Sequence, residues 1–148
     1  MRDVKAHCDE MVSEELIDII IDCPPGVSCP AVNAVMDSDV IFMVTEPTPF
    51  GVYDLKLAHE AFTPMGKPMA VVVNRAGLGD DSLYDYCREK DLAIVTEIPY
   101  SRRIAEAYST GRLITDTADD YRTQFINLAQ KAMEMAGETV VPEVVEHV

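Results

Sequence analysis

Residues 68–79, PMAVVVNRAGLG, place a run of β-branched residues directly before a polar loop that contains two glycines. The same plan recurs in residues 39–51, DVIFMVTEPTPFG, and in residues 92–100, LAIVTEIPY. An earlier run, LIDIIID at 16–22, ends in a carboxylate and precedes Cys-Pro-Pro-Gly. Continuous apolar runs without alternation are typical of strands covered on both faces, as in parallel sheets. We therefore expect strands at 16–22, 39–45, 68–74 and 92–98.

Helical patterns separate these runs. We expect helices at 4–15, 28–36, 52–62, 80–90, 101–108 and 116–136, the last one ending before Gly137. Strands that alternate with helices predict an α/β fold, with a mostly parallel sheet flanked by helices. We expect residues 1–137 to form a single α/β domain. Residues 138–148 form a C-terminal tail, read either as a frayed end or as an edge strand.

Length and charge narrow the possible functions. The chain has 148 residues, with 12 Lys and Arg against 26 Asp and Glu, which gives a net charge of −14. Nucleic acids and anionic membranes are disfavoured as partners, because phosphate binding needs clustered cations. No apolar run approaches the roughly 18 residues of a membrane span, and we expect none. The N-terminal residues lack the apolar core of a signal peptide.

The four cysteines, in a chain without a secretion signal, are expected to be reduced thiols in the cytoplasm. Cys23 and Cys29 are six positions apart, which matches no standard zinc or iron–sulfur spacing. Structural thiols are the favoured reading, with metal ligands as the alternative.

Polar residues follow the predicted strands, at the edge where parallel α/β sheets bind ligands. Asp22 ends the first strand, where a carboxylate can hold hydrated magnesium beside a phosphate or can cap the following turn. Glu46 lies in a proline-stiffened loop, typical both of functional loops and of ordinary turns. Asn74, followed by Arg75, offers a donor and an acceptor that suit the edge of a purine, although asparagine at a strand end is also a turn former.

Four strings, in this order, carry a family resemblance: IDIIIDCPPGVSCP (17–30), VTEPTPFGVYDLKLA (44–58), VVVNRAGLGDD (71–81) and EIPYSRRIAEAYSTG (97–111). They resemble the C-terminal half of MinD/Mrp-type P-loop ATPases, the ParA-like group of deviant Walker proteins. The most similar subgroup carries an inserted ferredoxin-type domain and is described as cobyrinic acid a,c-diamide synthase-like. The resemblance covers roughly residues 10–115.

The resemblance implies ATP and magnesium as cofactors, and it implies roles for individual residues. Asp22 matches the Walker B aspartate, which is catalytic and holds magnesium through water. Asn74, with Arg75 beside it, matches the residue that recognises adenine. The remaining implied binding residues belong to the phosphate-sensing switch (Pro24, Pro25, Gly26), to the segment beside the base (Ile98, Pro99), and to the loop and helix near the dimer interface (Glu46, Pro47, Asp54).

The chain departs from this family in one large respect. The phosphate loop of the family needs several glycines, then Lys and Ser or Thr, and these 148 residues contain no such string. The one Gly-Lys pair, Gly66-Lys67, precedes a predicted strand and reads as a turn. The inserted ferredoxin domain is absent too, so we expect no iron–sulfur cluster. We therefore expect a P-loop NTPase-like fold truncated at the N-terminus, as a fragment, a split gene product or a degenerate paralogue.

Two functions follow from this departure. The chain is either the ATP-binding half of a MinD/Mrp-like ATPase, inactive in hydrolysis alone, or a non-catalytic interaction or regulatory module with the same fold. The first reading requires a homodimer or a partner chain that supplies the phosphate loop. A response-regulator receiver also fits a small α/β domain, but its acidic pair and late lysine are absent.

Overall fold

A computed structural model of the chain describes residues 18–116 and 118–137. The chain divides into two compact units, one ending at Ser38 and one beginning at Asp39, and each is described by itself. The expected helix at 4–15 and the tail at 138–148 lie outside the described residues. The division into a domain at 1–137 and a tail stays a prediction.

The first unit contains one described helix, α2 (Cys29–Val35), with a proline in its first turn, and this confirms the helix expected at 28–36. The strand expected at 16–22 is wrong for its described part, since residues 18–22 have no strand structure. Ile20 is 96% exposed there, and Ile19 and Ile21 are also exposed. An apolar run becomes a covered strand only where a neighbouring strand completes its hydrogen bonds, and the described residues of the first unit contain no strand that could do so.

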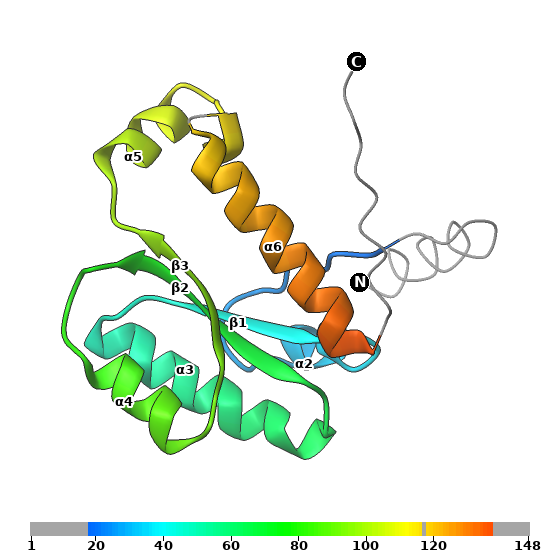
Figure 1. Cartoon of the computed structure of the whole chain (residues 1–148). Helices are drawn as coiled ribbons and strands as arrows, with labels where there is room; N and C mark the ends of the chain where they lie inside the picture. Colours follow the sequence, from blue (N-terminus) through cyan, green and yellow to red (C-terminus); the bar gives the residue numbers. More distant parts are fainter. Residues whose placement is uncertain (1–17, 117, 138–148) are drawn as a thin grey trace. The chain divides into compact units, whose positions relative to one another are not determined.

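The second unit is built on a parallel sheet of three strands, β1 (Ile41–Thr45), β2 (Met69–Ala76) and β3 (Ile94–Pro99), in the order β1-β2-β3 (Figure 1). β1 and β2 pair in regular register, from Ile41 opposite Met69 to Thr45 opposite Val73. The predictions at 39–45, 68–74 and 92–98 are confirmed. The order and direction follow from helical crossovers between successive strands.

Helices connect and cover these strands. Four of the expected helices are confirmed, with boundaries shifted by at most three residues. They are α3 (Pro49–Phe62), α4 (Ser82–Glu89), α5 (Arg102–Ser109) and α6 (Asp119–Ala136). Two short 3₁₀ turns, η1 (Thr63–Met65) and η2 (Ile114–Asp116), complete the unit.

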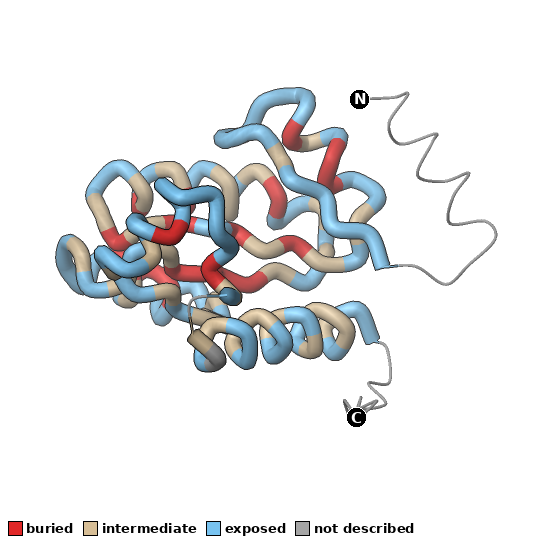
Figure 2. Tube along the Cα trace, turned by 90° about the horizontal axis from the view of Figure 1, so that it is seen from above, coloured by how far each residue is buried: buried red, intermediate tan, exposed pale blue. Residues whose placement is uncertain are grey.

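Opposite faces of the sheet carry different helices (Figure 1). Tyr84 of α4 donates a hydrogen bond to Glu97 of β3 (2.9 Å), whereas Gln124 of α6 donates to the hydroxyl of Thr96 (2.9 Å). Adjacent residues on a strand point to opposite faces, so α4 and α6 lie on opposite faces. The face of α3 and α4 holds the deeper core, with Val71, Val73 and Leu83 at 0% exposure. Along α6 the described residues are only intermediate or exposed (Figure 2).

The Gly66-Lys67 pair is a turn, as predicted. Gly66 closes η1 in the left-handed conformation (φ +65°), and β2 begins at Met69. A phosphate loop would instead lead into a helix.

β1 forms one margin of the sheet, yet its sequence, IFMVT, is that of an interior strand. It contains no proline, lysine or other charge that would discourage pairing at an open edge. Val44, on the face opposite α3, is 65% exposed. Within the sheet of the second unit, β1 therefore offers an apolar strand edge that no other strand covers.

The thiols differ in accessibility, and this predicts their order of alkylation. Cys87 is buried on α4, and burial raises the pKa of its thiol, so little reactive thiolate forms near pH 8. Cys29 is exposed. We expect iodoacetamide at pH 8 to label Cys29 at least about 100-fold faster than Cys87 in the folded protein, as measured by peptide mass spectrometry. Labelling in urea is the control and should equalise the two rates; equal rates without urea would contradict the burial of Cys87.

Candidate functional site at the carboxyl ends of the strands

The loop that follows β1 is fixed by its own side chains. The hydroxyl of Thr45 donates to the carbonyl oxygen of Gly51 (2.8 Å), and the N–H of Gly51 donates to the hydroxyl of Thr48 (3.1 Å). Thr48 thereby caps α3. A Cβ at Gly51 would collide with the carbonyl oxygen of Glu46, so only glycine fits there. Pro47 is fully buried between these contacts. The loop is thus a rigid platform rather than an adaptable turn.

The loop that follows β2 packs against this platform. Gly79 has a positive φ of +72°, and a Cβ on it would overlap the carbonyl oxygen of Pro47. Arg75 lies with its Nε 3.3 Å from Oε1 of Glu46. Asn74 accepts a hydrogen bond at Oδ1 from the backbone N–H of Arg75 (3.0 Å). Backbone contact and an ion pair therefore join the ends of β1 and β2.

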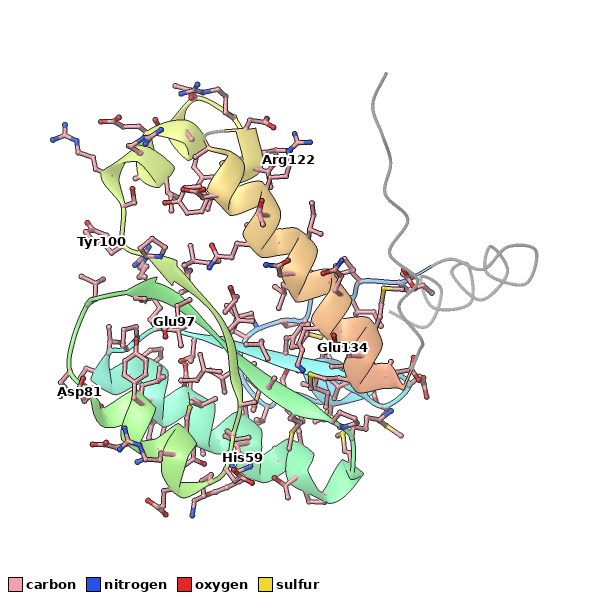
Figure 3. All side chains as sticks on the ribbon, viewed as in Figure 1. His59, Asp81, Glu97, Tyr100, Arg122 and Glu134 are labelled. Atoms are coloured by element: carbon pink, nitrogen blue, oxygen red, sulfur yellow. The ribbon has the colours of Figure 1, made fainter. Side chains whose placement is uncertain are left out.

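The end of β3 completes the row. Ala76 pairs with Pro99, and the N–H of Tyr100 donates to the carbonyl oxygen of Ala76 (3.0 Å). Ile98 is half-buried and Pro99 is exposed. The Tyr100 ring is 64% exposed, and Figure 3 shows it beyond the end of β3. An apolar segment with an accessible aromatic ring therefore lies next to the Asn74–Arg75 segment.

Carboxylates and a phenol surround this edge. Burial raises the pKa of the Tyr84 hydroxyl, and its hydrogen bond to Glu97 raises it further. The hydroxyl and then the N–H of Ser82 lower the pKa of Asp80 by hydrogen bonding to its carboxylate. Asp80 is therefore a fixed anion at neutral pH, and Tyr84 remains a neutral donor.

The structure brings together six of the residues expected at the site. They lie at the ends of three adjacent strands: Glu46, Pro47, Asn74, Arg75, Ile98 and Pro99. Asp54 lies on α3, away from this row of strand ends. Asp22, Pro24, Pro25 and Gly26 belong to the first unit. Asp22 is exposed, and Gly26 has a left-handed φ of +78°.

The sequence did not predict that Gly79 packs against the loop that follows β1. Its signal was present, because two glycines in the loop after a strand indicate positive φ or a close backbone approach. The partner of that approach, Pro47, is 32 positions earlier. Spacing alone could not identify it.

The donor set for a metal is sparse. Within residues 18–116 and 118–137, no three His, Cys, Asp or Glu side chains gather to hold an ion. Asp22 offers magnesium a single carboxylate. This fits a magnesium ion whose other ligands are nucleotide phosphates and water molecules.

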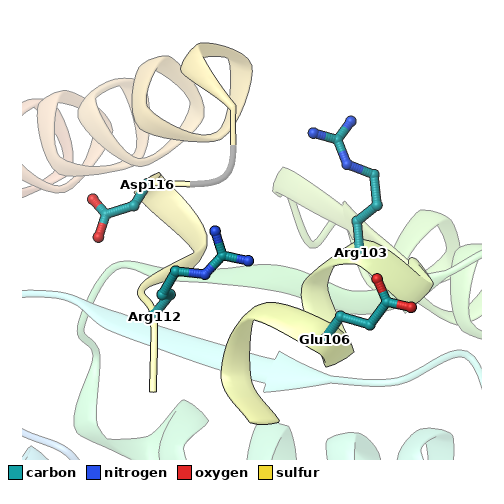
Figure 4. A pocket seen from close by; sticks show the side chains of 4 residues that line it. All are labelled: Arg103, Glu106, Arg112 and Asp116. Carbon is teal, nitrogen blue, oxygen red and sulfur yellow. The ribbon is translucent and has the colours of Figure 1, made fainter. Parts of the chain in front are cut away.

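A small surface pocket of about 140 Å³ lies elsewhere, on the second unit. Its lining comes from α5, the turn that follows α5, and η2, with two arginines and two acids: Arg103, Glu106, Arg112 and Asp116 (Figure 4). None of the expected site residues lines it. We therefore place the candidate site at the strand ends.

The parallel sheet and its crossover helices define an α/β domain. The solved structures that resemble it are the cell division ATPase MinD of Pyrococcus furiosus and the MinD cell division protein of Aquifex aeolicus. Their TM-scores are 0.64 and 0.66 at 20% and 21% identity, over 86% and 90% of this chain. The chain thus has a MinD-like P-loop fold, and it spans 56% and 59% of those two chains.

Sequence comparison finds two curated relatives in Methanocaldococcus jannaschii, the uncharacterized proteins MJ0579 and MJ0578. MJ0579 is 36% identical over 93 residues, 62% of this chain, and MJ0578 is 34% identical over 61 residues, 41% of this chain. The chain spans about a third of the first relative (31%) and about a fifth of the second (22%). No protein-family model matches the chain. No helix in the described ranges is long and apolar enough to cross a bilayer.

Proposed function

We propose that this chain is a nucleotide-binding part of a MinD-like ATPase of the cytoplasm, and that it binds ATP together with magnesium. The observation that carries the proposal is the row of strand ends in the second unit: Glu46 follows β1, Asn74 lies near the carboxyl end of β2, and Pro99 ends β3. Ligands of doubly wound α/β sheets bind in that position. The MinD neighbours support a nucleotide as the ligand, since MinD of Pyrococcus furiosus is described as an ATPase.

Each residue has a definite part in this proposal. Asn74 presents its amide to the base, and Ile98 and Pro99 provide the apolar surface beside it. Pro24, Pro25 and Gly26 form the phosphate-sensing switch, and Asp22 binds magnesium through water. Magnesium, when bound, would neutralise phosphate charge. Phosphoryl transfer also needs a cation on the terminal phosphate, and these 148 residues contain no glycine-rich loop with its lysine. We therefore propose that the chain alone does not hydrolyse ATP.

The chain pairs with a second copy, or with another chain that supplies that loop. The open edge of β1 supports such a partner, because its apolar sequence lacks the features that protect edge strands. A strand added to β1 would extend the sheet, and the loop after that strand would lie beside Glu46, at the edge where the phosphates of ATP are proposed to bind.

An interaction module without turnover is the second candidate. The absence of a lysine-bearing phosphate loop from this sequence favours it. It differs from the first candidate in one measurable respect, since it requires no affinity for ATP.

Binding of an N-methylanthraniloyl-labelled ATP, followed by fluorescence anisotropy, tests the proposal. We expect saturable binding that requires magnesium and that weakens at least about tenfold in Asn74→Ala, because the base edge loses its hydrogen-bond partner. Asn127→Ala, at an exposed position on α6, is the matched control and should bind as the parent does. Absence of binding at millimolar ligand would overturn the proposal and leave the interaction module.

A further inference from the structure

β2 contains one irregularity at its carboxyl end. Val73 pairs with Glu97, but the next pair is Ala76 with Pro99. Between these two pairs β2 therefore contains one residue more than β3, which is a β-bulge. Such a bulge re-aims side chains, and bulges are common beside functional sites. Arg75 sits in this bulge with φ +53°, in the left-handed region that a bulky residue seldom adopts. Backbone of this kind persists only where surrounding contacts hold it.

Contacts of both its backbone and its side chain hold Arg75 in this conformation. Its backbone N–H donates to Oδ1 of Asn74 (3.0 Å), and its Nε lies 3.3 Å from Oε1 of Glu46. Its carbonyl oxygen accepts a hydrogen bond from the N–H of Leu78 (3.2 Å). The first contact decides the orientation of the Asn74 amide, because a reversed amide would set its NH₂ group against another N–H. Oδ1 keeps one lone pair for a ligand, and both N–H groups of Nδ2 remain on the other side.

We propose that Arg75 is a positioning residue for base recognition: its left-handed backbone fixes the amide of Asn74 in one orientation, and Glu46 holds its side chain. This inference rests on the proposed function and adds selectivity to it. A fixed amide presents an acceptor beside donors, which complements the amino group and ring nitrogen of adenine. Guanine presents two acceptors at the same edge, so Oδ1 would face its O6. The site therefore selects ATP over GTP.

Three variants separate the parts of this arrangement. Arg75→Gly keeps the N–H and adopts positive φ without strain, but it removes the ion pair. Arg75→Val keeps the N–H and disfavours positive φ, because its branched Cβ clashes with the backbone there. Glu46→Gln removes the charge that holds the guanidinium. Arg88→Val, at an exposed position on α4, is the matched control for the loss of an arginine.

The readout is the ratio of dissociation constants for N-methylanthraniloyl-labelled GTP and ATP, with magnesium present. We expect the parent chain to prefer ATP by at least about tenfold. Arg75→Gly and Arg88→Val should keep that preference within about threefold, Glu46→Gln should reduce it, and Arg75→Val should abolish it. An unchanged ratio in Arg75→Val would overturn the inference and leave the proposed function standing. Absence of binding for both nucleotides would overturn both.

The side-chain amide of Asn74 reports its position without any nucleotide. In ¹⁵N-resolved NMR spectra, we expect its two proton signals to keep their shifts in Arg75→Gly and to move towards free-amide values in Arg75→Val. Unmoved signals in Arg75→Val would show that Arg75 does not fix the amide. Circular dichroism of each variant confirms that the change is local.

Discussion

Gly79→Ala should lower the free energy of unfolding by about 3–5 kcal/mol, a loss typical of severe steric defects. The added Cβ would overlap the carbonyl oxygen of Pro47, and that proline is fully buried and cannot yield. The loop after β2 would have to separate from the loop after β1. Urea unfolding followed by far-ultraviolet circular dichroism measures the effect in a chain that contains no tryptophan.

Gly77→Ala is the matched control for this change. Gly77 has a larger positive φ, +93°, but a Cβ there meets nothing within 4 Å. Only the conformational strain of alanine remains, which costs about 1–2 kcal/mol. Equal losses in the two variants would contradict the close packing of Gly79 on Pro47.

Leu83→Ala is expected to produce the second large loss, about 2–5 kcal/mol. Leu83 begins the apolar side of α4 and is 0% exposed beneath the sheet. Truncation removes buried methyl groups and leaves a cavity that the packed β2 valines cannot fill. The same urea titration measures the shift in midpoint.

Leu113→Ala provides the control, because Leu113 is 64% exposed. An identical change of side chain should there cost less than about 0.5 kcal/mol. A loss at Leu113 as large as that at Leu83 would contradict the location of the core.

The three-stranded sheet was predictable because its evidence is local. Each strand is a run rich in β-branched residues, and proline or glycine lies at or just after its end: Pro47 after β1, Gly77 after β2 and Pro99 at the end of β3. The run at 18–22 has the same composition but forms no strand. Burial of an apolar run depends on what lies beside it in space, and composition does not report that.

For the candidate site, the sequence predicted which residues lie at the strand ends but not the contacts between them. Parallel strands bring their carboxyl ends to one edge, so Glu46 and Asn74 could be expected there from order alone. The ion pair of Glu46 with Arg75 depends on a bulge that shifts register by one residue. The contact of Gly79 with Pro47 depends on the path of two loops. Neither contact produces a periodic pattern in the sequence, so neither could be predicted without the three-dimensional structure.

The open edge of β1 has a consequence for behaviour in concentrated solution. An uncovered apolar strand is a template on which other copies can stack into aggregates. Mutual repulsion opposes that encounter, because every copy carries a net charge of −14. The range of this repulsion is about 30 Å at 0.01 M salt but about 8 Å at 0.15 M. Ionic strength therefore controls how closely the β1 edges of two copies approach each other. At low salt, a basic partner could reach the β1 edge, whereas a second acidic copy would be repelled.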